Sequence, residues 1–108
     1  LFHLPDDEPF FFAGLWDHWE GKEGEESIDS CTIITTEANQ LVQPVHHRMP
    51  VILDPKDYDA WLDPAYDDST QLEQLLTSSS PNALTCYPVS LLVNNARHDG
   101  LDCVTSLA

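Results

Sequence analysis

Residues 31–36 read Cys-Thr-Ile-Ile-Thr-Thr, and this uncharged, largely β-branched run is the stretch that most directly decides the fold. β-Branched side chains favour extended backbone, and an apolar run of this length is typical of a strand in the middle of a sheet. We therefore predict a buried central strand here, preceded by a loop at residues 21–26 that is rich in glycine and glutamate.

Further strands are expected on both sides of this run. Apolar residues 1–4 and 10–16 are separated by Pro-Asp-Asp-Glu-Pro, a pattern that predicts a hairpin. Residues 84–89 predict a fourth strand. Residues 93–100, rich in asparagine and ending in glycine, predict a loop with unusual backbone angles.

The first of two expected helices covers residues 54–62. It opens with an Asp-Pro pair, in which the aspartate can cap the helix and the proline suits its first turn. Its apolar face is expected to consist of Tyr58, Trp61 and Leu62. A shorter helical turn is expected at residues 37–43, before a proline ends it.

The second helix is expected to begin near Thr70, which has capping-box spacing with Glu73. Its buried stripe is formed by three leucines: Leu72, Leu75 and Leu76. A loop is expected at residues 78–82. The fold class is therefore α+β, mostly β with two short helices.

Length and charge exclude several classes of protein. A chain of 108 residues allows one small domain, or part of one. Four basic against 19 acidic residues give a net charge of −15, which repels nucleic acid and anionic membranes unless the few cations are concentrated in one place. No apolar run is long enough to cross a bilayer, and the start does not resemble a signal peptide. We expect an intracellular protein without a membrane partner.

The cysteines are expected to be small buried thiols. Cys31, Cys86 and Cys103 are odd in number and lack Cys-x-x-Cys spacing, which argues against a disulfide framework or a structural zinc site. A thiol hydrolase that uses Cys86 or Cys103 with His98 is a further alternative, although no known nucleophile motif surrounds either cysteine.

No metal or cofactor is expected. A metal site would have to combine His18, His46 and His47 with Asp17 or Glu20, and this set lacks a second paired spacing. The glycines form no phosphate-binding loop. The aromatic residues could stack on bases, but most are expected to belong to the core.

Residues 45–50, Val-His-His-Arg-Met-Pro, carry the strongest chemical signal. In extended backbone, residues two apart face the same side, so His46 and Arg48 are expected to point together and His47 away. An imidazole beside a guanidinium suits an acid/base group next to an anion-binding one. The alternative is that His46 is a hydrogen-bonded structural histidine and Arg48 pairs with a carboxylate.

Several blocks of the sequence, taken in order, resemble the SOS-response-associated peptidase (SRAP) family. They are residues 9–16 (PFFFAGLW), 32–39 (TIITTEAN), 46–53 (HHRMPVIL), 61–62 (WL), 87–90 (YPVS) and 93–95 (VNN). The block at 46–53 is the specific one. The family domain is about twice this length, so the resemblance implies that residues 1–108 are a single partial domain, the C-terminal half of a SRAP-like mixed barrel or sheet.

The resemblance also implies a function as a sensor and shield of abasic sites in single-stranded DNA. Family members use an N-terminal cysteine, whose amine and thiol condense with the aldehyde of the ring-opened sugar into a thiazolidine crosslink. The same cysteine is assigned as the nucleophile that removes a short leader peptide. In this sequence, His46 matches the family histidine beside the deoxyribose, Arg48 matches the arginine that holds a DNA phosphate, and Thr35 lines the DNA side of the site.

The family's Met-Cys-Gly-Arg start, its asparagine-containing block and the segment with its catalytic glutamate do not occur in these residues. The complete domain is thus expected to be an enzyme-like crosslinker, and these residues alone to be inactive and to bind DNA weakly. The alternative is a non-catalytic acidic module that binds a basic protein. Self-association through unpaired strand edges is a further expectation. The implied location is the cytoplasm, at the nucleoid in a bacterium, or the nucleus in a eukaryote.

Overall fold

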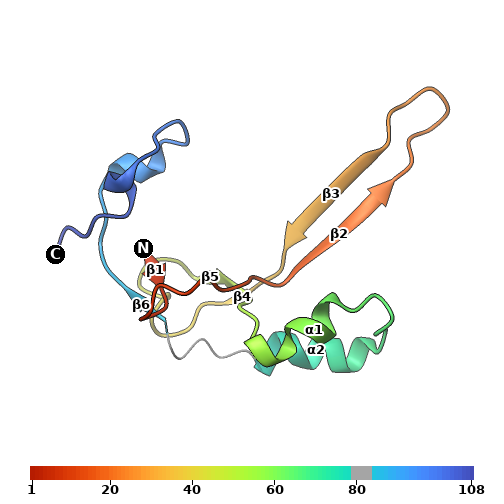
Figure 1. Cartoon of the computed structure of the whole chain (residues 1–108), viewed down its shortest axis with the longest axis horizontal. Coiled ribbons are helices and arrows are strands. Elements are labelled where there is room, and N and C mark those ends of the chain that lie inside the picture. The colour runs from red at the N-terminus through yellow and green to blue at the C-terminus, as the bar shows by residue number, and fades with distance from the viewer. Residues whose placement is uncertain (79–83) are drawn as a thin grey trace. The chain divides into compact units, whose positions relative to one another are not determined.

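The computed structural model describes residues 1–78 and 84–108 (Figure 1). The chain forms two compact units, one of residues 10–81 and the other of residues 1–9 together with 82–108. Short antiparallel strands and two short α-helices confirm the predicted α+β, mostly β, fold class. Among the described residues, no helix is long and apolar enough to span a membrane.

The elements follow one another in a mixed order along the chain. The strands are β1 (Phe2–His3), β2 (Gly14–Trp19), β3 (Ile28–Ile33), β4 (Thr35–Glu37), β5 (Arg48–Pro50) and β6 (Thr85–Cys86). The helices are the 3₁₀ turn η1 (Pro55–Asp57), α1 (Tyr58–Leu62), α2 (Ser69–Ser78), and the 3₁₀ turns η2 (Leu91–Asn94) and η3 (Leu101–Cys103). The strands pair two by two, as β1–β6, β2–β3 and β4–β5.

The long hairpin of the chain is β2–β3, in register from Gly14 opposite Ile33 to Trp19 opposite Ile28 (Figure 1). The loop between the two strands turns at Gly24, whose φ of 87° favours glycine. The hairpin predicted between residues 1–4 and 10–16 is therefore wrong, since the second of those segments pairs with the strand that follows it.

Strand β1 instead pairs with β6, which lies more than eighty residues further along the chain: Phe2 is opposite Cys86. After β1 the chain makes a tight turn, in which Asp7 has a φ of 54° and its amide donates to the carbonyl of Leu4. The strand predicted at residues 84–89 is accordingly reduced to two residues. Such a short pairing depends on contacts between residues far apart in the sequence, so the local sequence pattern could not predict it.

The β-branched run at 31–36 is divided between β3 and β4 rather than forming one central strand. At the division, the amide of Ile34 donates to the carbonyl of Ala13, and its own carbonyl accepts from the amide of Val51, both at 2.9 Å. The chain thus changes partner at Ile34, from β2 to the β5 segment. β3 is exposed along its length, so the prediction of a buried strand is wrong there, because no third described strand pairs with the hairpin.

The core of the larger unit is small and lies beside this change of partner. Its buried residues are Ala13, Val51 and Leu53. Partly buried side chains that pack against them are Ile34, Tyr58, Trp61 and Leu76. The indole Nε1–H of Trp61 also donates to the carbonyl of Gly14 at 3.2 Å, which ties α1 to the start of β2.

The first predicted helix is confirmed as η1 followed by α1. The Asp54 carboxylate accepts from the amide of Lys56 at 3.1 Å, and Pro55 occupies the first position. Tyr58 and Trp61 face the core as predicted. Leu62 does not, since it is 76% exposed at the C-terminal end of a helix of only five residues.

The second predicted helix is confirmed as α2, with its three leucines half-buried. Its predicted capping box is wrong: the Asp68 carboxylate accepts from the amide of Gln71 at 3.2 Å, so the helix begins one residue earlier and Thr70 lies inside it. Beyond Ser78, the loop predicted at 78–82 lies outside the described residues.

The cysteines and many aromatic side chains are more exposed than predicted. All three cysteines are free, Cys31 and Cys86 are exposed, and Cys103 is half-buried. Trp16 is 75% exposed on β2, and other exposed aromatics are Phe11, Phe12 and Trp19. For Trp16, Trp19 and Cys31 the reason is that the β2–β3 hairpin has no described strand or helix packed along its faces.

Candidate functional site

The candidate site lies where β4 pairs with β5. Glu37 is opposite Arg48 and Thr35 is opposite Pro50 in the register. Strand alternation turns Met49 inward, where it is 5% exposed, and leaves Arg48 on the solvent side. The Arg48 side chain passes its directly opposed residue and reaches Thr35, to which its Nη2 donates two hydrogen bonds: 2.9 Å to the carbonyl oxygen and 3.0 Å to Oγ1.

The partners of Arg48 are neutral. Among the described residues, the ion pairs all involve histidines (His3–Asp7, His18–Asp29 and His98–Asp102), and no carboxylate pairs with Arg48. The structure therefore does not contain the carboxylate pairing that the sequence left open as an alternative. The guanidinium thus has no carboxylate partner among the described residues, although the net charge of the chain is −15.

His46 is placed by a turn that precedes β5. Residues 40–45 form turns rather than the helical turn predicted at 37–43, with the amide of Gln43 donating to the carbonyl of Asn39 at 2.9 Å. The amide of His46 then donates to the carbonyl of Val42 at 3.0 Å. His46 is thus fixed at the end of a turn and not in an extended strand.

The imidazole of His46 is anchored on the backbone of Arg48. Its Nδ1 lies 2.9 Å from the amide nitrogen and 3.0 Å from the carbonyl oxygen of that residue. When Nδ1 is unprotonated it can accept from the amide, and when it carries a proton it can donate to the carbonyl. One ring nitrogen therefore keeps a partner in every protonation state, and Nε2 remains available to act on another molecule.

His47 does not point away from His46, as the extended-strand argument predicted. The two rings are stacked, with centroids 4.6 Å apart and planes inclined by 18°. Because His46 lies in a turn, the alternation of a strand does not apply there. His46 does contact Arg48, but the contact is between its ring and the Arg48 backbone and not between two side chains on one strand face.

These residues lie on an open surface. Two hollows of about 310 and 270 Å³ flank Trp61, and neither is lined by Thr35, His46 or Arg48. The three residues are exposed. An exposed cation with an adjacent imidazole suits a large anionic ligand that lies across the surface better than a small molecule enclosed in a cavity.

The histidines considered for a metal site do not all lie together. His18 lies on β2 with its Nδ1 2.5 Å from Asp29 of β3, whereas His46 and His47 precede β5.

Sequence reasoning missed two contacts of the candidate site: the hydrogen bond that the Thr35 carbonyl accepts from Arg48, and the anchoring of His46 on the Arg48 backbone. The His-x-Arg spacing was the signal that could have suggested the second of these contacts.

Comparisons with known proteins identify the family of the chain. The profile of the family described as SOS response associated peptidase (SRAP) matches residues 1–96. The abasic site processing protein YoqW of Bacillus subtilis is 38% identical over 97 residues, and the abasic site processing protein HMCES of Gallus gallus is 36% identical over 96 residues. A crystal structure of a protein from Bacteroides thetaiotaomicron superposes with a TM-score of 0.80 at 25% identity.

The matches cover most of this chain and a smaller part of each relative. They include 90% of this chain and 43% of YoqW, 88% of this chain and 28% of HMCES, and 98% of this chain and 47% of the Bacteroides protein. The chain thus spans less than half the length of these relatives. With a family profile that matches residues 1–96 and a solved fold that superposes on nearly all of it, the chain belongs to the SRAP family.

Proposed function

We propose that this chain is part of an abasic-site processing domain, in which Arg48 and Thr35 bind the DNA backbone and His46 moves protons at the abasic sugar. The relatives are named abasic site processing proteins, which supports the substrate class. The observation that carries the proposal is the pairing of Arg48 with two neutral acceptors directly beside the anchored imidazole of His46.

Arg48 suits a phosphate because most of its donors remain free. A guanidinium has five N–H groups, and the two on Nη2 can serve the two oxygens of Thr35, which leaves the three on Nε and Nη1. Each of those three can donate a charge-assisted hydrogen bond to a phosphate oxygen. The Thr35 contacts hold the fork in one orientation, so less side-chain entropy is lost when DNA binds.

His46 suits proton transfer at the sugar because Nε2 is free while Nδ1 stays bonded. To open the ring, a base removes the proton of the C1′ hydroxyl, the C1′–O4′ bond breaks, and O4′ takes up a proton, which gives an aldehyde. His46 can accept the first proton at Nε2 while Nδ1–H donates to the Arg48 carbonyl. It can then return that proton to O4′, after which Nε2 is again unprotonated and Nδ1–H still donates to the Arg48 carbonyl.

The covalent step needs an amine and a thiol from an N-terminal cysteine, which on this proposal lies outside these 108 residues. The amine adds to the aldehyde, and the resulting hydroxyl leaves as water after protonation, giving an imine. The thiolate then adds to the imine carbon and the nitrogen takes up a proton, which closes a thiazolidine. On this proposal, His46 protonates the leaving hydroxyl.

The test is a covalent band on a denaturing gel. The protein from the complete reading frame and the 108-residue chain are each incubated with a single-stranded oligonucleotide that contains one abasic site. We expect a band with the complete protein and none with the 108 residues alone. No band from a folded complete protein would contradict the proposal.

DNA binding gives a second, independent test. Each phosphate neutralised on single-stranded DNA contributes about −0.7 to the slope of log affinity against log salt. We expect Arg48→Ala in the complete protein to make the slope less negative by about that amount, and Thr35→Val to weaken affinity less, because the carbonyl acceptor remains. The control is Lys22→Ala, which removes the same charge from the loop at the far end of the β2–β3 hairpin. Equal changes for Arg48→Ala and Lys22→Ala would mean that Arg48 has no local role.

A second candidate function is an acidic module that binds a basic protein, favoured by the net charge of −15. It predicts salt-sensitive binding to a basic protein that Arg48→Ala leaves unchanged or strengthens. DNA crosslinking by the complete protein would argue against it as the main function.

A further inference from the structure

We propose that His98, Asp102 and Cys103 form a binding site for a divalent transition-metal ion, with Zn²⁺ as the ion that fits best. The three residues lie at the C-terminal end of the chain, beyond residues 1–96 that match the family profile. They belong to the compact unit that contains η2 and η3, and not to the unit that contains Arg48.

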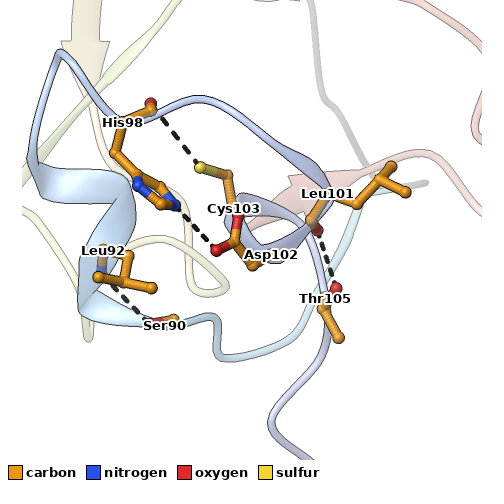
Figure 2. Close-up of polar contacts among 7 residues, drawn as sticks. All are labelled: Ser90, Leu92, His98, Leu101, Asp102, Cys103 and Thr105. Atoms are coloured by element: carbon orange, nitrogen blue, oxygen red, sulfur yellow. Dashed lines mark hydrogen bonds and ion pairs between the residues drawn. The ribbon is translucent and has the colours of Figure 1, made fainter.

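The ligand atoms are already close together. One nitrogen of the His98 ring, one carboxylate oxygen of Asp102 and the sulfur of Cys103 lie within 4.8 Å of one another. The shortest of these separations, 2.9 Å, joins His98 Nε2 to Asp102 Oδ2 (Figure 2). Zinc bonds of about 2.0–2.3 Å place tetrahedral ligands roughly 3.3–3.8 Å apart, so small side-chain rotations would admit the ion.

The backbone around the three residues is held by its own hydrogen bonds. The amide of His98 donates to the carbonyl of Asn95 at 2.9 Å, and the amide of Cys103 donates to the carbonyl of Gly100 at 3.1 Å. Further along, the hydroxyl of Thr105 donates to the carbonyl of Leu101 at 2.8 Å (Figure 2). Two short turns therefore hold the three ligand residues close together, so metal binding would not have to order a flexible chain.

Two further features constrain the cluster. The phenol of Tyr87 donates to the carbonyl of Val104 at 2.6 Å, which fastens the end of η3 to the segment after β6. Gly100 has a φ of 149°, and a Cβ at that position would lie 3.0 Å from Oδ1 of Asp102. The glycine thus permits both the turn and the position of the carboxylate.

The chemistry of the donors selects the kind of ion. Imidazole and thiolate favour Zn²⁺, Co²⁺ and similar ions over Mg²⁺ and Ca²⁺, which prefer oxygen ligands. Binding would form bonds from the metal to His98 Nε2, Asp102 Oδ and Cys103 Sγ. The thiol proton would pass to solvent, Nε2 would give up its proton so that the ring keeps a single proton on Nδ1, and the His98–Asp102 hydrogen bond would be exchanged for two metal bonds.

Access and ligand number indicate an open coordination position. The side chains of His98 and Asp102 are 30% and 52% exposed, so an ion can enter from solvent. Three protein ligands leave the fourth tetrahedral position for water or for a ligand atom of another molecule.

The geometry favours a metal over the thiol hydrolase that the sequence left open for these residues. A nucleophilic cysteine needs a ring nitrogen of the base directed at its sulfur. Here the His98 Nε2 is directed at Asp102, and the described contact of Cys103 Sγ is a weak one of 4.0 Å to the His98 carbonyl.

The test uses cobalt as a spectroscopic probe in the 108-residue chain. The background is the Cys31→Ser/Cys86→Ser variant, which leaves Cys103 as the one thiol of the chain. We expect Co²⁺ to bind at one equivalent with a thiolate-to-cobalt charge-transfer band and the visible bands of tetrahedral cobalt, and Zn²⁺ to displace it. Cys103→Ser should abolish the charge-transfer band. His98→Ala and Asp102→Asn should each weaken binding by at least about tenfold.

The matched control is His18→Ala, which removes another exposed histidine that pairs with a carboxylate across the β2–β3 hairpin. It should leave the cobalt spectrum and affinity unchanged. Circular dichroism shows which variants fold, and Asp102→Asn, the smallest change, decides the result where another variant does not. No charge-transfer band, or a band that persists at the same affinity in the folded site variants, would overturn the proposal.

Discussion

Replacing His46 by asparagine distinguishes the role of Nδ1 from that of Nε2 and gives the sharpest test of the proposed site. The asparagine amide oxygen can take the place of Nδ1 and accept from the amide of Arg48, which now lies 2.9 Å from that ring nitrogen. Nothing in asparagine reaches the place of Nε2. The substitution therefore keeps the anchor and removes the group that would exchange protons with the sugar.

The expected effects on rate and stability differ in size. Loss of a general acid or base lowers a rate by about 10² to 10⁴-fold, which corresponds to about 3–5 kcal/mol of activation free energy. The stability change should stay below about 0.5 kcal/mol, as for most exposed substitutions that keep their hydrogen bond. In His46→Ala the anchor is lost as well, at a cost of about 0.5–1.5 kcal/mol.

The assay is single-turnover crosslinking to an oligonucleotide with one abasic site, with urea unfolding of the same proteins. We expect His46→Asn and His46→Ala of the complete protein to be equally slow, and only the alanine variant to unfold at lower urea concentration. His47→Ala serves as a control for ring stacking, since it removes the stacked partner but neither nitrogen of His46.

Two results would refute this reasoning. If His46→Asn crosslinks at the unaltered rate, proton transfer at Nε2 is not needed. If His46→Ala is slow and His46→Asn recovers the full rate, His46 acts by holding the turn and Arg48 in place, which is the structural role that the sequence left open.

Three further predictions concern the fold. Leu53→Ala should lower the free energy of unfolding by about 2–5 kcal/mol, because Leu53 is 4% exposed. Leu62→Ala, at a position that is 76% exposed, should lower it by less than about 0.5 kcal/mol. Equal losses of the two variants in urea denaturation would contradict the assigned core. Asp68→Ala should cost about 0.5–2 kcal/mol through its cap on α2, and an equal loss in Asp67→Ala would show that the cap is not the cause. Gly100→Ala should lower stability by about 1–3 kcal/mol because of its positive φ, and an unchanged thermal midpoint would refute that assignment.

Local chemistry made some elements predictable. The Asp54–Pro55 pair starts a helix because the short Asp54 side chain can accept from the amide two residues further on. This contact needs no distant partner. The leucine stripe of α2 was predictable for a similar reason, since helical period alone sets which residues share a face. The capping residue was missed because three successive positions, Asp68, Ser69 and Thr70, each carry a side chain that can cap a helix.

The candidate site was predictable in composition and not in arrangement. The spacing of His46 and Arg48 identified both residues, and the resemblance to the family added Thr35. Their mutual geometry depends on a turn at residues 40–45 and on the register of β4 with β5, so the stacking of His47 on His46 contradicted an argument built on extended backbone.

The sequence by itself determined the fold class, which follows from period and turn residues over a few neighbouring positions, and the family, which follows from the order of several motif blocks. The tertiary structure alone decided that β1 pairs with β6 and that Ile34 changes partner. The physical reason is that strand pairing and side-chain clustering depend on which distant surfaces are buried together. That free-energy balance is a property of the whole chain and not of any short segment.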